Sequence, residues 1–163
     1  MEQFVIVQYK GIYAQQRHRS GRNGMYDPSK NDKQAVERFY VESKKIHDLS
    51  SAFDEPVGVL CIFEKKYRKN KKKSDFFWDT KPDSDNLEKF VFDVAENCGI
   101  LKNDSRIAVK LTLKLWGEHD RSTILFSSLS DDSKLFYGPS YVGLDQHTFS
   151  LDNRTFQSTH FLL

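Results

Sequence analysis

An apolar stripe near the middle of the chain constrains the fold most, because it specifies a helix with one face that must be buried. Its members recur at intervals that place them on one side of an α-helix: Leu87, Phe90, Val91, Val94, Ala95 and Cys98. Asp83, Ser84 or Asp85 can cap the start of this helix. Gly99 stands where a left-handed C-cap is expected. We therefore predict an amphipathic helix over about residues 85–98.

Other segments have the composition of β-strands. Residues 3–9 (QFVIVQY) combine alternation with β-branched side chains, and residues 57–63 (VGVLCIF) are a nearly continuous apolar run that favours a strand buried on both faces. Residues 107–116 alternate, which predicts a strand with one buried face. The residues of that face are Ile107, Val109, Leu111, Leu113 and Leu115. Residues 122–127 are predicted to pair back on this strand as a hairpin, and residues 76–79 (FFWD) add an optional short strand.

A second helix is predicted over about residues 31–48, with turn and N-cap chemistry ahead of it in residues 27–29. Its apolar residues at helical spacing are Ala35, Phe39, Ile46 and Leu49. The resulting order, β-α-β-(β)-α-β-β, argues for a single α+β domain with a mixed sheet and two main helices. This domain is predicted to span residues 1–127. Residues 128–163 change character, with glycine, proline and scattered aromatic residues, and form a C-terminal extension of unassigned structure.

Length and composition favour one intracellular domain. The chain has 163 residues, and although only 38% of them are hydrophobic, 13 phenylalanines allow a compact core. No window approaches about 18 consecutive apolar residues, and the start MEQFVIVQYK lacks the features of a signal peptide. Cys61 and Cys98 fall at apolar positions, which favours reduced core thiols over a disulfide. We therefore expect a cytoplasmic protein that is neither secreted nor membrane-bound.

Basic residues are concentrated in two clusters, although the formal net charge is only +2. The first cluster is Arg17, Arg19 and Arg22. The second places seven basic residues among nine: Lys65, Lys66, Arg68, Lys69, Lys71, Lys72 and Lys73. Such runs are either solvated loops or contacts for the phosphates of a nucleic acid. The aromatic triplet that follows, residues 76–78, is equally compatible with core packing and with stacking on exposed bases.

Three aspartates suggest a metal site. Asp83 and Asp85 are separated by one residue ahead of the helix, where their side chains can flank a shared position. The predicted helix carries the chain about 20 Å away, and the six residues that follow, if extended, can return Asp104 by about 20 Å. Three converging carboxylates suit Mg²⁺, which prefers oxygen ligands. A D-x-D pair alone is also common as a helix cap, and Glu88 replaces the glycine that a calcium loop needs at its sixth position.

The stretch from Lys81 to Ile107, KPDSDNLEKFVFDVAENCGILKNDSRI, resembles the signature of RusA-type Holliday junction resolvases. In that family a D-x-D-N-L-x-K motif opens a helix, and a further aspartate stands just ahead of a strand. The resemblance implies that Asp83, Asp85 and Asp104 are the catalytic, metal-binding aspartates.

Further residues of this stretch acquire roles from the same resemblance. It implies that Lys89 is the catalytic lysine, which lies one helical turn after Asp85 and can reach the scissile phosphate. Asn86 is a motif residue that helps to set the loop. Helical spacing, and not the resemblance, puts Asp93 one turn after Lys89, where it can hold that side chain in place. The chain departs from the family at Asn103, where an aspartate is common, and in GIYAQQRHR, which lacks the family's Pro-rich, Asn-containing stretch.

The resemblance implies a RusA-like fold and a metal-dependent endodeoxyribonuclease that resolves four-way junctions in DNA recombination and repair. The expected cofactor is Mg²⁺, with Mn²⁺ as a substitute, and no organic cofactor is expected. The expected partners are branched DNA and a second copy of the chain, because a homodimer supplies two sites for symmetric cleavage of two strands. Two alternatives stay open: a noncatalytic junction-binding module on the same fold, and a nuclease for flaps or forks.

Overall fold

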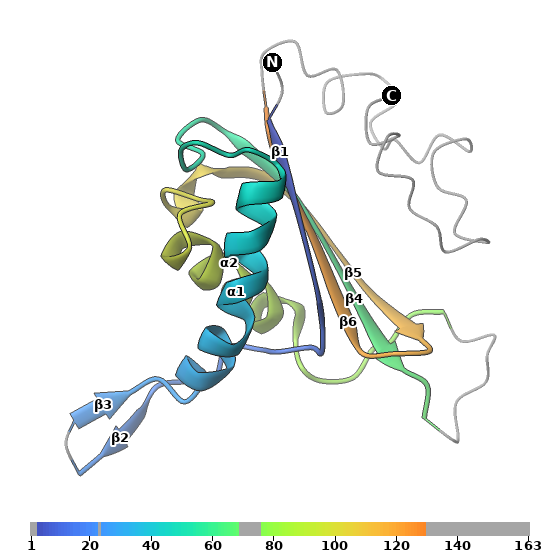
Figure 1. Cartoon of the computed structure of the whole chain (residues 1–163). Helices are drawn as coiled ribbons and strands as arrows, with labels where there is room; N and C mark the ends of the chain where they lie inside the picture. Colours follow the sequence, from blue (N-terminus) through green and yellow to red (C-terminus); the bar gives the residue numbers. More distant parts are fainter. Residues whose placement is uncertain (1–2, 23, 69–75, 130–163) are drawn as a thin grey trace. The chain divides into compact units, whose positions relative to one another are not determined.

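The computed structural model describes residues 3–22, 24–68 and 76–129 (Figure 1). Its elements in chain order are β1 (Phe4–Lys10), β2 (Arg19–Gly21), β3 (Gly24–Tyr26), α1 (Lys30–Ile46), β4 (Val57–Lys66), α2 (Ser84–Asn97), the 3-10 helix η1 (Asp104–Arg106), β5 (Ile107–Gly117) and β6 (Arg121–Ser128). This confirms the predicted α+β domain. No helix among these elements is long and apolar enough to cross a membrane. From residue 130 on, the predicted C-terminal extension lies outside the described residues.

The described strands form a four-stranded mixed sheet in the order β1-β6-β4-β5, and β2 and β3 form a separate hairpin (Figure 1). β4 and β5 are parallel, since α2 connects them as a crossover. β6 is antiparallel to both β1 and β4, so the predicted hairpin between β5 and β6 is wrong. The position of β6 leaves the apolar run of β4 between two neighbouring strands, where every residue from Val57 to Phe63 is buried.

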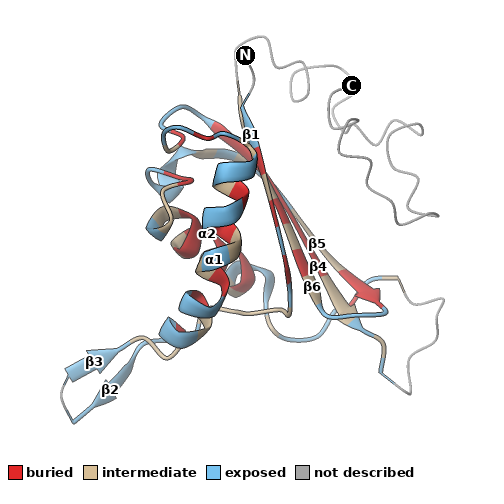
Figure 2. Ribbon diagram, in the orientation of Figure 1, coloured by how far each residue is buried: buried red, intermediate tan, exposed pale blue. Residues whose placement is uncertain are grey.

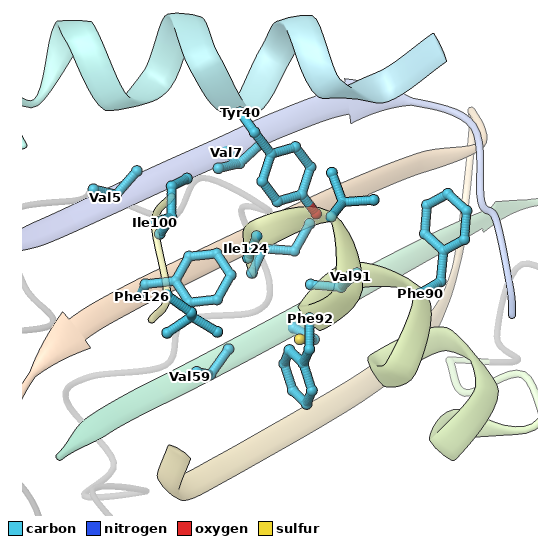
Figure 3. Packing of buried hydrophobic residues seen from close by; sticks show 14 of the residues in the cluster. Val5, Val7, Tyr40, Val59, Phe90, Val91, Phe92, Ile100, Ile124 and Phe126 are labelled. Atoms are coloured by element: carbon cyan, nitrogen blue, oxygen red, sulfur yellow. The ribbon is translucent and has the colours of Figure 1, made fainter. Parts of the chain in front are cut away.

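Both main helices lie on one face of this sheet, and the core fills the space between the two layers (Figure 1). Figure 3 shows how side chains of α1 and α2 meet alternate residues of β1, β4 and β6. Fully buried examples are Val5, Val7, Tyr40, Phe90, Val91, Ile100, Ile124 and Phe126. In β4, Val59, Cys61 and Phe63 belong to this core. Leu60 and Ile62 alternate with them and therefore lie on the opposite face.

The buried face predicted for β5 is wrong in part. Thr112 pairs with the core residue Cys61, so it shares with Trp116 the face that the helices cover, and Leu111, Leu113 and Leu115 lie on the other face. Leu111 is accordingly 49% exposed. Two polar side chains of β5, those of Lys110 and Thr112, contact Glu88 of α2. Alternation thus predicted correctly that Leu111, Leu113 and Leu115 share one face of β5. It did not predict that the helices cover the opposite face, which carries Thr112.

α1 begins and ends near its predicted limits but buries a different face. Its buried residues are Lys33, Val36, Tyr40 and Ser43. Of the predicted stripe, Phe39 is partly buried, Ala35 is exposed and Ile46 is 71% exposed. Leu49 is buried but follows the end of the helix. The apolar period misled the prediction because the buried face contains a lysine and a serine.

α2 agrees closely with its prediction. Asp83 is its N-cap residue, and Gly99 follows it with a left-handed φ of +67°. All of its predicted stripe is buried except Cys98, which is half-buried. Cys61 and Cys98 are both free within the described part of the chain. α2 is therefore the element that the sequence specified best.

The segment ahead of α2 forms a single bridge, Phe77 to Leu115, in place of the optional strand. Trp78 is a core residue at 2% exposure, whereas Phe77 is 64% exposed. The aromatic triplet is thus divided between the core and the surface, and only its exposed part is free to stack on a ligand.

Candidate active site

Asp83 and Asp85 lie at the start of α2, and both are exposed. The Asp83 carbonyl accepts a hydrogen bond from the Leu87 amide at 3.2 Å, in the first turn of the helix. An N-cap aspartate usually uses its carboxylate to accept hydrogen bonds from the first helical amides. Asp83 makes no such capping bond within the described residues, so its carboxylate remains available to a ligand. Asp85 lies in the first turn, where the helix dipole stabilises negative charge.

Lys89 lies one turn further along α2 with a side chain that is 60% exposed, and its Nζ is 3.5 Å from Asp93 Oδ1. The other oxygen of Asp93 accepts a hydrogen bond from Lys33 of α1 at 2.8 Å. Lys33 also donates to Asp27 Oδ2 at 2.8 Å. Asp93 therefore contacts Lys89, but its shorter contact is with a lysine that the sequence analysis did not select.

Lys33 and Asp27 belong to a largely buried ionic network. Burial alone would lower the pKa of Lys33, but hydrogen bonds and charges from Asp27 and Asp93 outweigh it and raise that pKa. Burial alone would raise the pKa of Asp27, but hydrogen bonds from Lys33 and the Ser29 amide lower the pKa to about 2. Lys33 and Asp27 are therefore both charged at neutral pH, and their network connects the loop ahead of α1 to α2.

The segment after β1 links this network to the start of α2. The Gln15 amide donates to the Asn86 carbonyl at 2.8 Å, and the Gln15 side chain donates to Asp27 at 3.0 Å. The β2–β3 hairpin follows and is exposed throughout its strands (Figure 2). The predicted DNA contacts in and beside this hairpin, all exposed, are Arg17, Arg19 and Arg22. The segment that leads into this basic hairpin is thus hydrogen-bonded, through Gln15, to Asn86 of the D-x-D-N-L-x-K motif.

Two lysines of the sheet, Lys65 of β4 and Lys114 of β5, hold the loop that leads into Asp83. They donate to three consecutive carbonyls of this loop, those of Thr80, Lys81 and Pro82. Both ammonium groups also lie over the ring of Trp78, at 4.2 Å and 4.7 Å from its centroid. Lys65, a predicted DNA contact, is therefore half-buried and bound to its own chain.

The rest of the second basic cluster divides between described and undescribed residues. Lys66 and Arg68 are exposed at and beyond the end of β4. The remaining predicted DNA contacts, which lie outside the described residues, are Lys69, Lys71, Lys72 and Lys73.

Glu88 is a carboxylate that the sequence analysis assigned to no site. It is 8% exposed and accepts hydrogen bonds from the Thr112 hydroxyl at 2.6 Å and from Lys110. These bonds attach the second turn of α2 to β5. Glu88 follows Leu87 directly in the apolar stripe of α2, and this position could have indicated that it is buried. A buried carboxylate needs hydrogen-bond partners, so partners on a neighbouring strand could have been expected.

Asp104 lies at the opposite end of α2. Its amide donates to the side chain of Glu96 in the last turn of that helix. Glu96 follows Asp85 by eleven residues, which corresponds to about 16 Å along the helix axis. The intervening chain does not return along α2, because Ile100 and Leu101 are buried and pair with the loop ahead of β4.

The predicted convergence of the three aspartates within one chain is therefore wrong. In the described part of the chain, no three His, Cys, Asp or Glu side chains lie close enough together to hold a metal ion. The return toward Asp83 is made by β5, which brings Lys114 there in place of Asp104. One chain thus presents Asp83 and Asp85 at one end of α2 and Asp104 at the other. The three carboxylates are suitable ligands for Mg²⁺, but a single chain does not bring them together.

Comparison with known families identifies the family of the chain. A comparison with curated proteins gives no match. The family model described as Endodeoxyribonuclease RusA matches residues 11–125, well over half of the chain. The matched region contains both main helices, the three aspartates and the lysines that hold the loop ahead of α2. The chain therefore belongs to the RusA family of endodeoxyribonucleases.

Proposed function

We propose that this chain resolves four-way DNA junctions by Mg²⁺-dependent hydrolysis during recombination and repair, with Asp83, Asp85 and Asp104 as metal ligands. The observation that carries the proposal is the family match, which spans all three aspartates. The exposure of each of them in the domain supports it. Carboxylate oxygens suit Mg²⁺, and Mn²⁺ accepts the same kind of ligand set.

The separation of the aspartates favours a site shared between two copies. Because Asp104 lies beside the last turn of α2, one copy supplies only Asp83 and Asp85 at a common point. We infer that Asp104 of a second copy completes each site. A twofold homodimer then forms two identical sites, one for each strand to be cut at a junction.

The chemistry divides between the metal and the residues of the chain. A bound Mg²⁺ lowers the pKa of a water molecule and stabilises charge on the phosphate. Lys89, exposed on the same face as Asp85, contacts the scissile phosphate, and Asp93 limits the positions of its ammonium group. Asn86 fixes the start of α2 against the segment after β1 through its carbonyl.

Basic side chains outside this centre bind the DNA backbone. The exposed group is Arg17, Arg19, Arg22, Lys66 and Arg68, and the proposal extends to Lys69, Lys71, Lys72 and Lys73. Contacts of this kind set affinity without reading sequence, so binding weakens steeply as salt rises. Lys65 contributes less to this surface because its ammonium group is engaged within the domain.

The experiment that tests the proposal compares nicking of a synthetic four-way junction, a fork and a linear duplex. Asp85→Asn should reduce Mg²⁺-dependent nicking of the junction by at least about a hundredfold while leaving junction binding intact. Glu118→Gln, an exposed carboxylate in the β5–β6 turn, is the matched control and should cleave normally. Nicking unaffected by Asp85→Asn refutes the proposal. Wild-type binding without cleavage favours the noncatalytic module, and a preference for forks favours the flap or fork nuclease.

A further inference from the structure

The peptide unit that enters Asp83 is held from the sheet. Its oxygen is the Pro82 carbonyl, which accepts a hydrogen bond from Lys114 Nζ at 2.9 Å. A peptide unit is planar, so fixing this oxygen also fixes the amide and the Cα atom of Asp83. On the other side, the Asp83 carbonyl accepts the Leu87 amide at 3.2 Å. Both peptide units that flank the Asp83 side chain are therefore bonded.

Lys114 is itself fixed in place. It donates a second hydrogen bond, to the Thr80 carbonyl at 2.8 Å, and its ammonium lies 4.7 Å from the centroid of the buried Trp78 ring. The Trp78 amide in turn donates to the Lys114 carbonyl at 3.0 Å. Lys65 lies 4.2 Å from the same ring and donates to the Lys81 carbonyl at 3.2 Å. The loop is thus held at successive carbonyls by two lysines that share one indole.

The electrostatic surroundings of Lys114 include two carboxylates of the same segment. Burial lowers the pKa of Lys114, while the charges of Asp83 and Asp79 act to raise it. Neither Lys114 nor Lys65 belongs to the D-x-D-N-L-x-K motif. They reach it from the two parallel strands β4 and β5, which α2 connects.

We propose that Lys114 is a positioning residue for Asp83, acting through the Pro82 carbonyl, and that Lys65 is a second and weaker support. The consequence for cleavage rests on the proposed function, whereas the consequence for the backbone of Asp83 does not. Without the hydrogen bond from Lys114, the backbone at Asp83 is less restrained, and the Asp83 carboxylate is held less firmly beside Asp85.

The test compares Lys114→Met, which keeps the length of the side chain but removes its donors, with Lys114→Arg, which keeps both donors and charge. Lys45→Met, an exposed lysine in the last turn of α1, is the matched control. Three quantities are measured: hydrogen exchange of the Leu87 amide relative to the Val94 amide in the middle of α2, single-turnover nicking at saturating junction, and junction Kd without divalent metal.

Lys114→Met should speed exchange at Leu87 by at least about threefold with little change at Val94. It should slow nicking by on the order of tenfold while the junction Kd stays within about threefold. Lys114→Arg should restore most of the nicking rate. Lys65→Met should shift the same quantities in the same direction by less, which keeps the proposal testable if Lys114→Met folds poorly.

The proposal is overturned by unchanged exchange at Leu87 in Lys114→Met. It is equally overturned by weaker junction binding with an unchanged rate at saturation, because this pattern describes a phosphate contact. Faster exchange throughout α2, with no rescue by arginine, describes a general stabilising role and also refutes it. If the wild type nicks no junction, the proposed function fails, and the exchange at Leu87 alone then decides the role of Lys114.

Discussion

The two ends of α2 carry aspartates of one proposed site, yet the domain holds them differently. At the start, the backbone around Asp83 is bonded to a sheet lysine, and Asn86 is bonded to the segment after β1. At the end, Asp104 follows a buried turn, and the ion pairs around it join Asp54 to Lys102 and Arg106 on the surface. The start of α2 is thus held by hydrogen bonds from the sheet and from the segment after β1, whereas Asp104 is held by a hydrogen bond to Glu96 of α2 itself.

The buried network between α1 and α2 and the exposed ion pairs near the end of α2 should respond very differently to removal of a lysine. Lys33→Met leaves Asp27 and Asp93 without their buried cation and should cost about 3–5 kcal/mol, measured as a fall in Tm and in the free energy of unfolding. Lys102→Met removes an exposed partner of Asp54 and should leave Tm close to that of the wild type. Equal losses in the two variants would contradict the comparison.

Lys89 should matter for cleavage but little for stability. Its side chain is 60% exposed, and its ion pair with Asp93, the only one it makes among the described residues, is 3.5 Å long. Lys89→Met should therefore leave Tm nearly unchanged and slow nicking about a hundredfold, equivalent to about 2.7 kcal/mol. A lowered Tm with normal nicking would make Lys89 a structural residue and remove it from the proposed site.

The smallest effect is expected at the turn that ends α2. Gly99 has a φ of +67°, and a Cβ atom there would lie 3.1 Å from Lys44 Nζ. Gly99→Ala should cost about 1–2 kcal/mol of unfolding free energy, because an L-residue is strained in this conformation. Gly21→Ala, where a Cβ atom meets only ordinary contacts, should cost less. If Gly99→Ala is neutral in chemical denaturation, this turn does not fix the path toward Asp104.

The sequence predicted α2 and the exposed aspartates at its start because local chemistry specifies both. The stripe from Leu87 to Cys98 gives the helical face, Gly99 requires a left-handed turn, and Asp83 and Asp85 follow from their place at the helix start. The family resemblance, now shown by the match over residues 11–125, rests on the same motif.

The errors arose where tertiary packing decides. The path to Asp104 depends on burial of Ile100 and Leu101, which no local pattern distinguishes from an extended return. Lys33 and Lys114 were missed because each is a polar residue on a face that packing covers, and apolar periodicity treats such positions as exposed. The pairing of β6 with β4 likewise depends on the order of strands in the sheet.

The central claim is that the aspartates at the two ends of α2 act together only across two copies, and mixing inactive variants tests it most directly. Asp85→Asn and Asp104→Asn should each fail to nick a four-way junction with Mg²⁺. After the two variants are mixed and allowed to exchange subunits, each mixed dimer contains one site with all its aspartates, so nicking should return to about a quarter of the wild-type level. Mixtures as inactive as the separate variants, under conditions where mixed dimers are shown to form, would contradict the account.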